Sequence, residues 1–256
     1  MAFLVFDSGI GGLGVAQQIR RLAPGQELIY LADNGFFPYG EKPDDILLPH
    51  IVGLIGQAIA ALEPQAVVVA CNTASTIALP ALRAAYGSLP VIGCVPPVKP
   101  AAAASASKVI GVLATAATVR RPYLSGLIET FAPGCNVLSL GTPALAELAE
   151  RKFRGEAVDV EAAIAPLFRQ EGGQHIDAIA LGCTHYTFLQ PEFSALRPDI
   201  SWFDPAVPVA RHTLRVTGHL PPGHNPQAGV AFFTGEALPP ALLAPYGFTG
   251  AETCQW

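Results

Sequence analysis

Short apolar runs alternate with amphipathic stretches along most of the chain, and this alternation constrains the fold more than any other feature of the sequence. An apolar run that leads into a helical pattern is typical of a βα unit in a parallel sheet. We expect strands at residues 3–6, 27–32, 66–70, 109–114, 135–140, 178–182 and 200–203. Helical spacing covers residues 15–22, 44–62, 75–86, 119–131, 143–153 and 160–170. The pattern predicts an α/β fold built on parallel sheets.

Two pairs of motifs repeat at nearly the same spacing. One strand ends in small polar residues at Asp7 and another at Thr115, 108 positions later (115 − 7). Strands also lead into Cys71 and Cys183, which are 112 positions apart (183 − 71). Such spacing suggests that the chain consists of two similar α/β halves that arose by duplication. We expect two similar parallel-sheet α/β lobes related by a pseudo-twofold axis, with the active site in the cleft between them and a lobe boundary near residue 97.

The composition excludes several classes of protein. Of 256 residues, 51% are hydrophobic and 14% are charged, so we expect a compact fold and no long disordered segment. The net charge is −5 and the basic residues cluster only in pairs, so we expect no nucleic-acid partner. The apolar stretch 101–119 contains Ser105, Ser107 and Lys108, which makes it a poor membrane span, and the N-terminus does not resemble a signal peptide. The five cysteines, an odd number, favour reduced thiols in the cytoplasm.

Cys71 and Cys183 are the candidate reactive groups. Each follows a strand and precedes polar residues, and a helix N-terminus at such a place favours a thiolate. Two such thiols on opposite sides of a bound molecule can remove a proton from one face and return one to the other, which inverts a stereocentre. We expect Cys94, Cys135 and Cys254 to be small buried residues instead. The sequence has no C-x-x-C or H-E-x-x-H spacing, so it predicts no metal site.

The first glycine-rich loop leaves another interpretation open. Gly9, Gly11 and Gly14 fit the G-x-G-x-x-G spacing of a dinucleotide-binding loop, and Asp33 follows 19 residues after the last glycine (33 − 14). Asp7, however, places a carboxylate where a pyrophosphate would bind. A positively charged group fits this position better, so a dinucleotide-dependent oxidoreductase is the less favoured alternative.

Four motifs together indicate a family. They are Asp7-Ser8-Gly9, the segment 33–42 with Phe37-Pro38-Tyr39-Gly40, Ala70-Cys71-Asn72-Thr73-Ala74-Ser75, and Leu181-Gly182-Cys183-Thr184-His185-Tyr186. In this order they resemble cofactor-independent glutamate racemases, from residue 3 to about residue 215. Residues 91–103, 111–123 and 144–156 resemble the Gram-negative bacterial branch. One departure is Thr187, where the family usually has a proline.

The resemblance implies roles for individual residues. Cys71 corresponds to the catalytic thiol that takes the proton from the D-enantiomer, and Cys183 corresponds to the thiol that serves the L-enantiomer. Asp7 and His185 correspond to catalytic polar residues beside these thiols, and Glu150 corresponds to a supporting acidic residue. The expected substrate-binding residues are Asp7, Ser8, Pro38, Tyr39, Gly40, Asn72, Thr73, Thr115, Thr118, Thr184 and His185.

The resemblance also implies an isomerase that converts L-glutamate to D-glutamate for peptidoglycan synthesis, with no cofactor and no metal. It implies a cytoplasmic homodimer whose residues 1–97 and 208–256 form the first lobe and whose residues 98–207 form the second. An aspartate racemase of the same superfamily is the alternative. A single-thiol decarboxylase is disfavoured by the two cysteines, and a non-catalytic binding role is a third interpretation.

Overall fold

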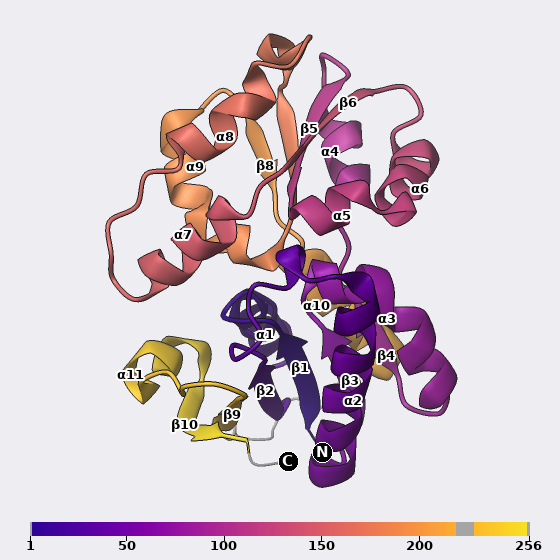
Figure 1. Cartoon of the computed structure of the whole chain (residues 1–256), viewed down its shortest axis with the longest axis vertical. Helices are drawn as coiled ribbons and strands as arrows, with labels where there is room; N and C mark the ends of the chain where they lie inside the picture. The colour runs from indigo at the N-terminus through magenta and orange to yellow at the C-terminus, as the bar shows by residue number, and fades with distance from the viewer. Residues whose placement is uncertain (1, 219–227, 255–256) are drawn as a thin grey trace. The chain divides into compact units, whose positions relative to one another are not determined.

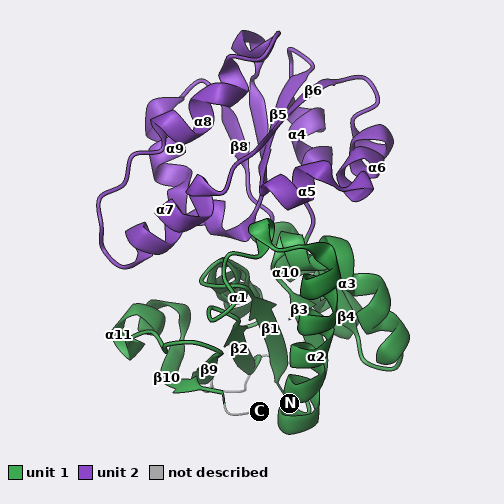
Figure 2. Ribbon diagram, in the orientation of Figure 1, with its two compact units in different colours: residues 1–94, 206–256 green, residues 95–205 purple. Residues whose placement is uncertain are grey.

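The computed structural model describes residues 2–218 and 228–254. They form two compact units, one of residues 1–94 with 206–256 (unit 1) and one of residues 95–205 (unit 2), as Figure 2 shows. The predicted boundaries after residues 97 and 207 lie within three residues of this division. Each unit has a parallel sheet of its own.

Unit 1 is built on a six-stranded sheet with the order β10-β9-β2-β1-β3-β4, in which every strand pair is parallel (Figure 1). Its strands are β1 Phe3–Asp7, β2 Leu28–Ala32, β3 Ala66–Val69, β4 Val91–Gly93, β9 Gly229–Phe233 and β10 Phe248–Thr253. Its helices are α1 Gly12–Leu22, α2 Asp44–Leu62, α3 Asn72–Ala85, α10 Ala206–Thr217 and α11 Pro240–Leu243, with the 3-10 helices η1 Tyr39–Glu41 and η4 Ala244–Tyr246.

The sheet of unit 1 is covered by helices, which explains its continuous apolar strands. β1 and β3 are buried along their whole length, as expected of strands with both faces covered. Leu47 and Ile51 of α2 and Leu82 of α3 pack in one core cluster with Val67 and Val69 of β3. α1 packs with α10, so the last described helix before the gap joins the first half of the chain.

Unit 2 is built on a four-stranded parallel sheet with the order β6-β5-β7-β8. Its strands are β5 Val109–Ala114, β6 Asn136–Gly141, β7 Ala178–Gly182 and β8 Ser201–Phe203. Its helices are α4 Val98–Ala104, α5 Ala116–Arg120, α6 Pro122–Phe131, α7 Ala144–Phe153, α8 Glu161–Phe168 and α9 Gln190–Leu196, with the 3-10 helices η2 Gly173–His175 and η3 Thr184–Leu189. Val98, Ala101 and Leu124 pack with Ile110 and Ala178 in its core.

The two sheets share one strand order, as the repeated spacing predicts. The run β2-β1-β3-β4 in unit 1 corresponds to β6-β5-β7-β8 in unit 2, and unit 1 adds β9 and β10 beyond β2. In both runs the strand before the cysteine loop, β3 or β7, pairs with the first strand of its unit, β1 or β5. Cys71 and Cys183 therefore occupy equivalent places in two similar α/β units, and the predicted α/β class is confirmed.

The structure adds elements that the sequence pattern did not predict. All seven predicted strands are present, but β4, β9 and β10 are additional. The segment after Cys183 is the 3-10 helix η3, and α-helix starts only at Gln190. Of the Pro- and Gly-rich segment from Leu220 onward, residues 220–227 and 255–256 lie outside the described residues. The strands β9 and β10 of this segment extend the unit 1 sheet, as the resemblance implies.

Helix α2 is long and apolar enough to cross a membrane, by its length and composition alone. Its first turn carries Asp44 and Asp45, and one face, with Leu47, Ile51 and Ile55, belongs to the core of unit 1. α2 is therefore a helix that covers the sheet.

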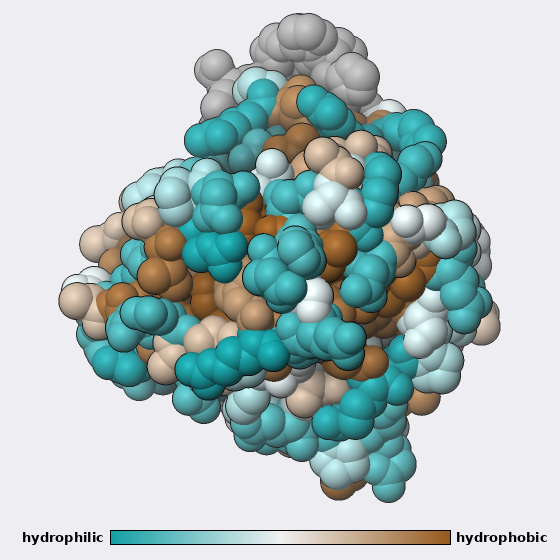
Figure 3. Space-filling view, turned by 90° about the horizontal axis from the view of Figure 1, so that it is seen from above, coloured by the Kyte–Doolittle hydropathy of each residue, from teal (hydrophilic) through white to brown (hydrophobic). Residues whose placement is uncertain are grey.

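On the face of the molecule seen in Figure 3, hydrophobic patches lie between hydrophilic residues, which is ordinary for a folded protein.

Candidate active site

In unit 1, two loops bring a carboxylate and a thiol together at the carboxyl edge of the sheet. Phe6 pairs with Val69 across β1 and β3, so that the next residues of both strands, which include Asp7 and Cys71, leave the sheet side by side. Asp7 is fully buried, and its Oδ1 accepts a 3.0 Å hydrogen bond from the Gly9 amide. The Ser8 hydroxyl oxygen lies 3.8 Å from the Cys71 sulfur. The thiol is thus placed beside the groups expected to bind an ammonium.

Cys71 directly precedes the 14-residue helix α3, which begins at Asn72. The first amides of an α-helix have no partner within the helix, and together with the helix dipole they favour an anion. Asn72 is 1% exposed, and neither its Nδ2 nor its Oδ1 has a hydrogen-bond partner among the described residues. A buried amide in this state requires an explanation, and a polar ligand beside Cys71 supplies one. Thr73, 2% exposed, is the next residue of this helix end.

The loop with Pro38, Tyr39 and Gly40 reaches the same edge of unit 1. Tyr39 is 2% exposed, and its hydroxyl donates a short hydrogen bond to Oδ2 of Asp33. Burial and the Asp33 carboxylate raise the pKa of Tyr39 well above its ordinary value, and Cys71 and Asp7 add to this effect. The tyrosine is therefore a neutral hydrogen-bond donor that lies among three acidic groups.

In unit 2, a histidine connects the other thiol to a carboxylate. His185 Nδ1 lies 4.0 Å from the Cys183 sulfur, and its Nε2 lies 3.1 Å from Oε1 of Glu150 on α7. Cys183 and His185 are buried, and the Glu150 side chain is 12% exposed. Arg154, which directly follows α7, holds the other oxygen of Glu150 at 3.3 Å. This chain of contacts can orient an imidazole toward a thiol and move a proton between them.

The neighbouring polar residues of unit 2 also lie at the carboxyl edge of its sheet. Thr184 is 1% exposed at the start of η3. Thr115 caps α5: its hydroxyl donates to Oγ1 of Thr118 at 3.0 Å and accepts from the Thr118 amide at 3.3 Å. The Tyr186 hydroxyl lies 3.1 and 3.0 Å from the carbonyl oxygens of Ala114 and Thr142, so it joins the ends of β5 and β6.

The predicted site residues thus fall into two groups, one in each unit. Unit 1 carries Asp7, Ser8, Pro38, Tyr39, Gly40, Cys71, Asn72 and Thr73, and unit 2 carries Thr115, Thr118, Glu150, Cys183, Thr184 and His185. Sequence reasoning did not predict the pairing of Arg154 with Glu150 or the anchoring hydroxyl of Tyr186. The four-residue spacing of Glu150 and Arg154 on one helix is a signal that could have indicated the first. No local signal indicates the second.

The dinucleotide interpretation finds no support in this geometry. Asp33, which would bind a ribose in a dinucleotide site, is 1% exposed, and its carboxylate accepts hydrogen bonds from Tyr39, His50 and Thr234. A Cβ at Gly12 would lie 2.9 Å from Cβ of Asp7, so this glycine serves close packing of α1 on the sheet. Within residues 2–218 and 228–254, no three His, Cys, Asp or Glu side chains gather as metal ligands do.

The sequence is similar to those of known racemases. The chain matches the sequence profile of the family described as Asp/Glu/Hydantoin racemase over residues 13–211. It is 52% identical over 214 residues to the glutamate racemase of Granulibacter bethesdensis, covering 83% of this chain and 77% of the relative. It is 47% identical over 215 residues to the glutamate racemase of Brucella anthropi, covering 82% of this chain and 77% of the relative.

A solved structure is similar over nearly the whole chain. The crystal structure of Escherichia coli glutamate racemase in complex with L-glutamate and the activator UDP-MurNAc-Ala matches with a TM-score of 0.88 and 37% sequence identity. The match covers 98% of this chain and 97% of that chain.

Proposed function

This chain belongs to the Asp/Glu/hydantoin racemase family, and on that premise we propose that it interconverts L- and D-glutamate with two thiols and no cofactor. One observation carries the proposal. Cys71 and Cys183 lie at equivalent places after β3 and β7, and each has polar partners within the same unit. Removing a proton from one face of the α-carbon and delivering a proton to the opposite face needs two such groups, one that takes a proton and one that gives one.

The proposed reaction begins with one thiolate and one thiol. In the D-to-L direction, the Cys71 thiolate removes the α-proton, and the Cys183 thiol donates its proton to the opposite face of the α-carbon. The product leaves Cys71 as a thiol and Cys183 as a thiolate, which is the state required for the reverse reaction. In the L-to-D direction the two thiols exchange these tasks, so no net proton is gained or lost.

The residues beside the thiols supply the binding groups that this reaction requires. We propose that Asp7 and Ser8 bind the α-ammonium, and that Asn72, Thr73 and Thr184 donate to the α-carboxylate. Negative charge that develops on this carboxylate in the transition state is stabilised by such fixed donors.

The remaining expected site residues complete the proposed site. The loop with Pro38, Tyr39 and Gly40 binds the side-chain carboxylate in this proposal. Thr115 and Thr118 support the α-carboxylate donors from the cap of α5. His185, held by Glu150, exchanges a proton with Cys183.

The proposal extends to the role of the enzyme in the cell. As the family resemblance implies, we propose that the product D-glutamate supplies peptidoglycan synthesis, and that the enzyme is a homodimer in the cytoplasm. Aspartate is the alternative substrate of the proposed reaction.

Circular dichroism of L-glutamate and, separately, of L-aspartate, incubated with metal-free and pyridoxal-free protein, tests the proposed function. We expect the signal of L-glutamate to decay to zero and that of L-aspartate to persist. Cys71→Ala and Cys183→Ala should each abolish the decay, because either change removes one of the two proton-transfer groups. Cys254→Ala in unit 1 and Cys135→Ala in unit 2 are the matched controls and should keep the wild-type rate. Near-normal turnover in either the Cys71 or the Cys183 variant would rule out the two-thiol mechanism.

A further inference from the structure

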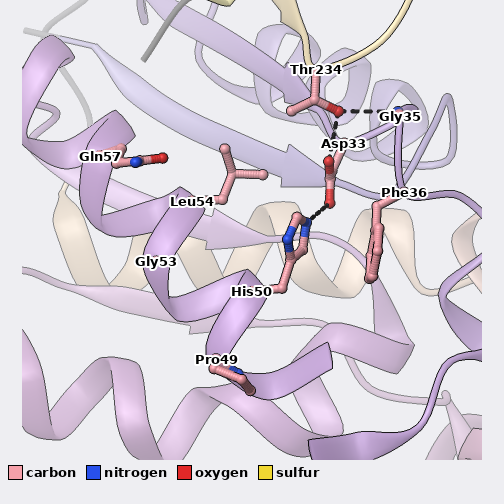
Figure 4. Close-up of a pocket in the computed structure, with 9 residues that line it drawn as sticks. All are labelled: Asp33, Gly35, Phe36, Pro49, His50, Gly53, Leu54, Gln57 and Thr234. Atoms are coloured by element: carbon pink, nitrogen blue, oxygen red, sulfur yellow. Dashed lines mark hydrogen bonds and ion pairs between the residues drawn. The ribbon is translucent and has the colours of Figure 1, made fainter. Parts of the chain in front are cut away.

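Asp33, which directly follows β2, is a buried carboxylate that accepts hydrogen bonds from three side chains. It is 1% exposed, and its Oδ2 accepts hydrogen bonds from the Tyr39 hydroxyl and from His50 Nε2, the latter at 2.6 Å. Its Oδ1 accepts from the Thr234 hydroxyl at 2.6 Å. Figure 4 shows His50 of α2 and Thr234, next to β9, converging on this carboxylate from two sides. Asp33 therefore joins the Tyr39 loop to two elements that lie far apart in the sequence.

The backbone around Asp33 is fixed by the C-terminal part of the chain. The Gly35 amide donates to the Thr234 hydroxyl oxygen at 3.0 Å. The Asn34 side chain donates to the Glu236 carbonyl at 2.7 Å and accepts from the Gly235 amide at 2.8 Å. These contacts join residues about 200 positions apart in the sequence and fix the backbone at Asn34 and Gly35. The Asp33 carboxylate consequently has a defined direction toward Tyr39.

The charge of Asp33 matters for the neighbouring loop. The Tyr39 hydroxyl donates to Asp33, and Cys71 and Asp7 are near enough to help raise the pKa of Tyr39. A side-chain carboxylate that binds at this loop would be repelled by a buried carboxylate that no positive group offsets. Of the three side chains that donate to Asp33, His50 alone can carry a positive charge. His50 is thus placed both to orient the carboxylate and to offset its charge.

His50 lies between Asp33 and solvent. Its side chain is 34% exposed, and its ring stacks on Phe36 with a centroid distance of 4.2 Å and an interplanar angle of 29°. It lines a cavity of about 490 Å³ whose other walls include Leu54, Gln57 and Pro49. A cavity of this size beside the ring has room for a small molecule to replace the ring if it is removed.

We propose that His50 is a positioning residue for substrate binding, which acts through Asp33 and Tyr39 on the loop that receives the side-chain carboxylate of the substrate. This inference rests on the proposed function, since it assigns a supporting residue to the loop that binds the side-chain carboxylate of the substrate in that reaction. It predicts a defect in substrate affinity and little change in the proton-transfer step.

Steady-state kinetics of His50→Ala test the inference. The variant loses a charge-assisted hydrogen bond to a buried carboxylate, so we expect KM for both enantiomers to rise about tenfold while kcat stays within about threefold of the wild-type value. Added imidazole should enter the vacated space, donate to Asp33 and lower KM again. His50→Gln, which keeps a nitrogen donor, should lie between wild type and His50→Ala. Gln57→Ala, which alters the same cavity without touching Asp33, should match wild type with and without imidazole.

A folded His50→Ala protein with wild-type KM, or with a raised KM that imidazole does not lower, would overturn the inference. If His50→Ala does not fold, His50→Gln and His50→Met, one with and one without a donor for Asp33, give the same test, and equal KM values for these two variants would overturn the inference. Failure of the proposed function looks different, since wild-type protein would then not racemise glutamate at all.

Discussion

His185 makes two contacts that only one tautomer satisfies when its ring is neutral. The Glu150 carboxylate can only accept, so Nε2 must carry a hydrogen, which leaves the Nδ1 lone pair facing the Cys183 thiol at 4.0 Å. When the thiol gives up its proton, Nδ1 can hold it, and the carboxylate then stabilises the imidazolium. Glu150 thus determines that Nε2 carries the hydrogen and that the nitrogen facing the sulfur, Nδ1, has a free lone pair when the ring is neutral. In the proposed mechanism the role of Glu150 is positional, because it acts through the histidine.

Glu150→Gln tests this role at the residue scale. The amide keeps an acceptor for Nε2–H but removes the charge, and a neutral hydrogen bond is weaker than a charge-assisted one, so we expect kcat/KM to fall about tenfold. The two enantiomers have equal free energy, so the fall must be the same in both directions. The substrate isotope effect with α-deuterated L-glutamate should rise, because removal of its proton by Cys183 becomes slower relative to the other steps.

The matched control for this experiment is Glu147→Gln, an exposed carboxylate one turn earlier on the same helix. It should keep wild-type kinetics. A Glu150→Gln enzyme that is as fast as this control would show that the carboxylate does not act on the histidine.

At the residue scale, sequence motifs can indicate candidate site residues, but they do not indicate which of these residues contact one another. Cys183, Thr184 and His185 are adjacent in sequence, so one motif identifies them together. The contact between His185 and Glu150 joins residues 35 positions apart, and those of Asp33 reach Thr234, 201 positions away. Such contacts depend on how helices pack on a sheet, which composition and periodicity do not specify.

At the scale of elements, strands were predictable where both of their faces are covered. β1, β3 and β7 are buried throughout and read as continuous apolar runs. β4 has only three residues and is followed closely by prolines, while β10 lies at a sheet edge, is partly exposed and contains a register shift. These strands were missed because their sequences carry little apolar periodicity.

Tyr186→Phe tests how strands β5 and β6 are joined at their carboxyl ends. The hydroxyl bridges the Ala114 and Thr142 carbonyls in a fully buried place, so its loss should lower the free energy of unfolding by about 1–2 kcal/mol at pH 7. Urea denaturation measures this difference. Tyr123→Phe, at a residue of the same unit that is 39% exposed, is the control and should change stability by less than about 0.5 kcal/mol.

The same variant has a predictable pH dependence. Burial, and then the nearby Cys183, raises the pKa of Tyr186 well above its ordinary value, so the folded state keeps this proton when the unfolded state has lost it. The resulting stability is fully present below about pH 10 and is lost as the pH rises further toward the folded-state pKa. The stability advantage of wild type over Tyr186→Phe should therefore shrink above about pH 10, and a constant difference up to pH 11 would contradict the assignment.

At the scale of the whole molecule, one chain contains two versions of the same strand arrangement, and each version presents one thiol. The strand order β2-β1-β3-β4 recurs as β6-β5-β7-β8, with Cys71 after β3 and Cys183 after β7. Neither unit alone has both a proton donor and a proton acceptor of this kind. In the proposed mechanism, this duplicated architecture accounts for a reaction that treats two mirror-image substrates alike.

If a single chain supplies both thiols, two different inactive chains cannot repair each other. We expect an equimolar mixture of Cys71→Ala and Cys183→Ala proteins, unfolded and refolded together so that subunits exchange, to remain as inactive as either variant. The alternative is a dimer in which Cys71 of one subunit works with Cys183 of the other. Half of the randomly formed dimers would then be mixed and one of their two symmetric sites intact, which restores about a quarter of the wild-type activity. Circular dichroism of L-glutamate with the refolded mixture, beside refolded wild type, separates these outcomes.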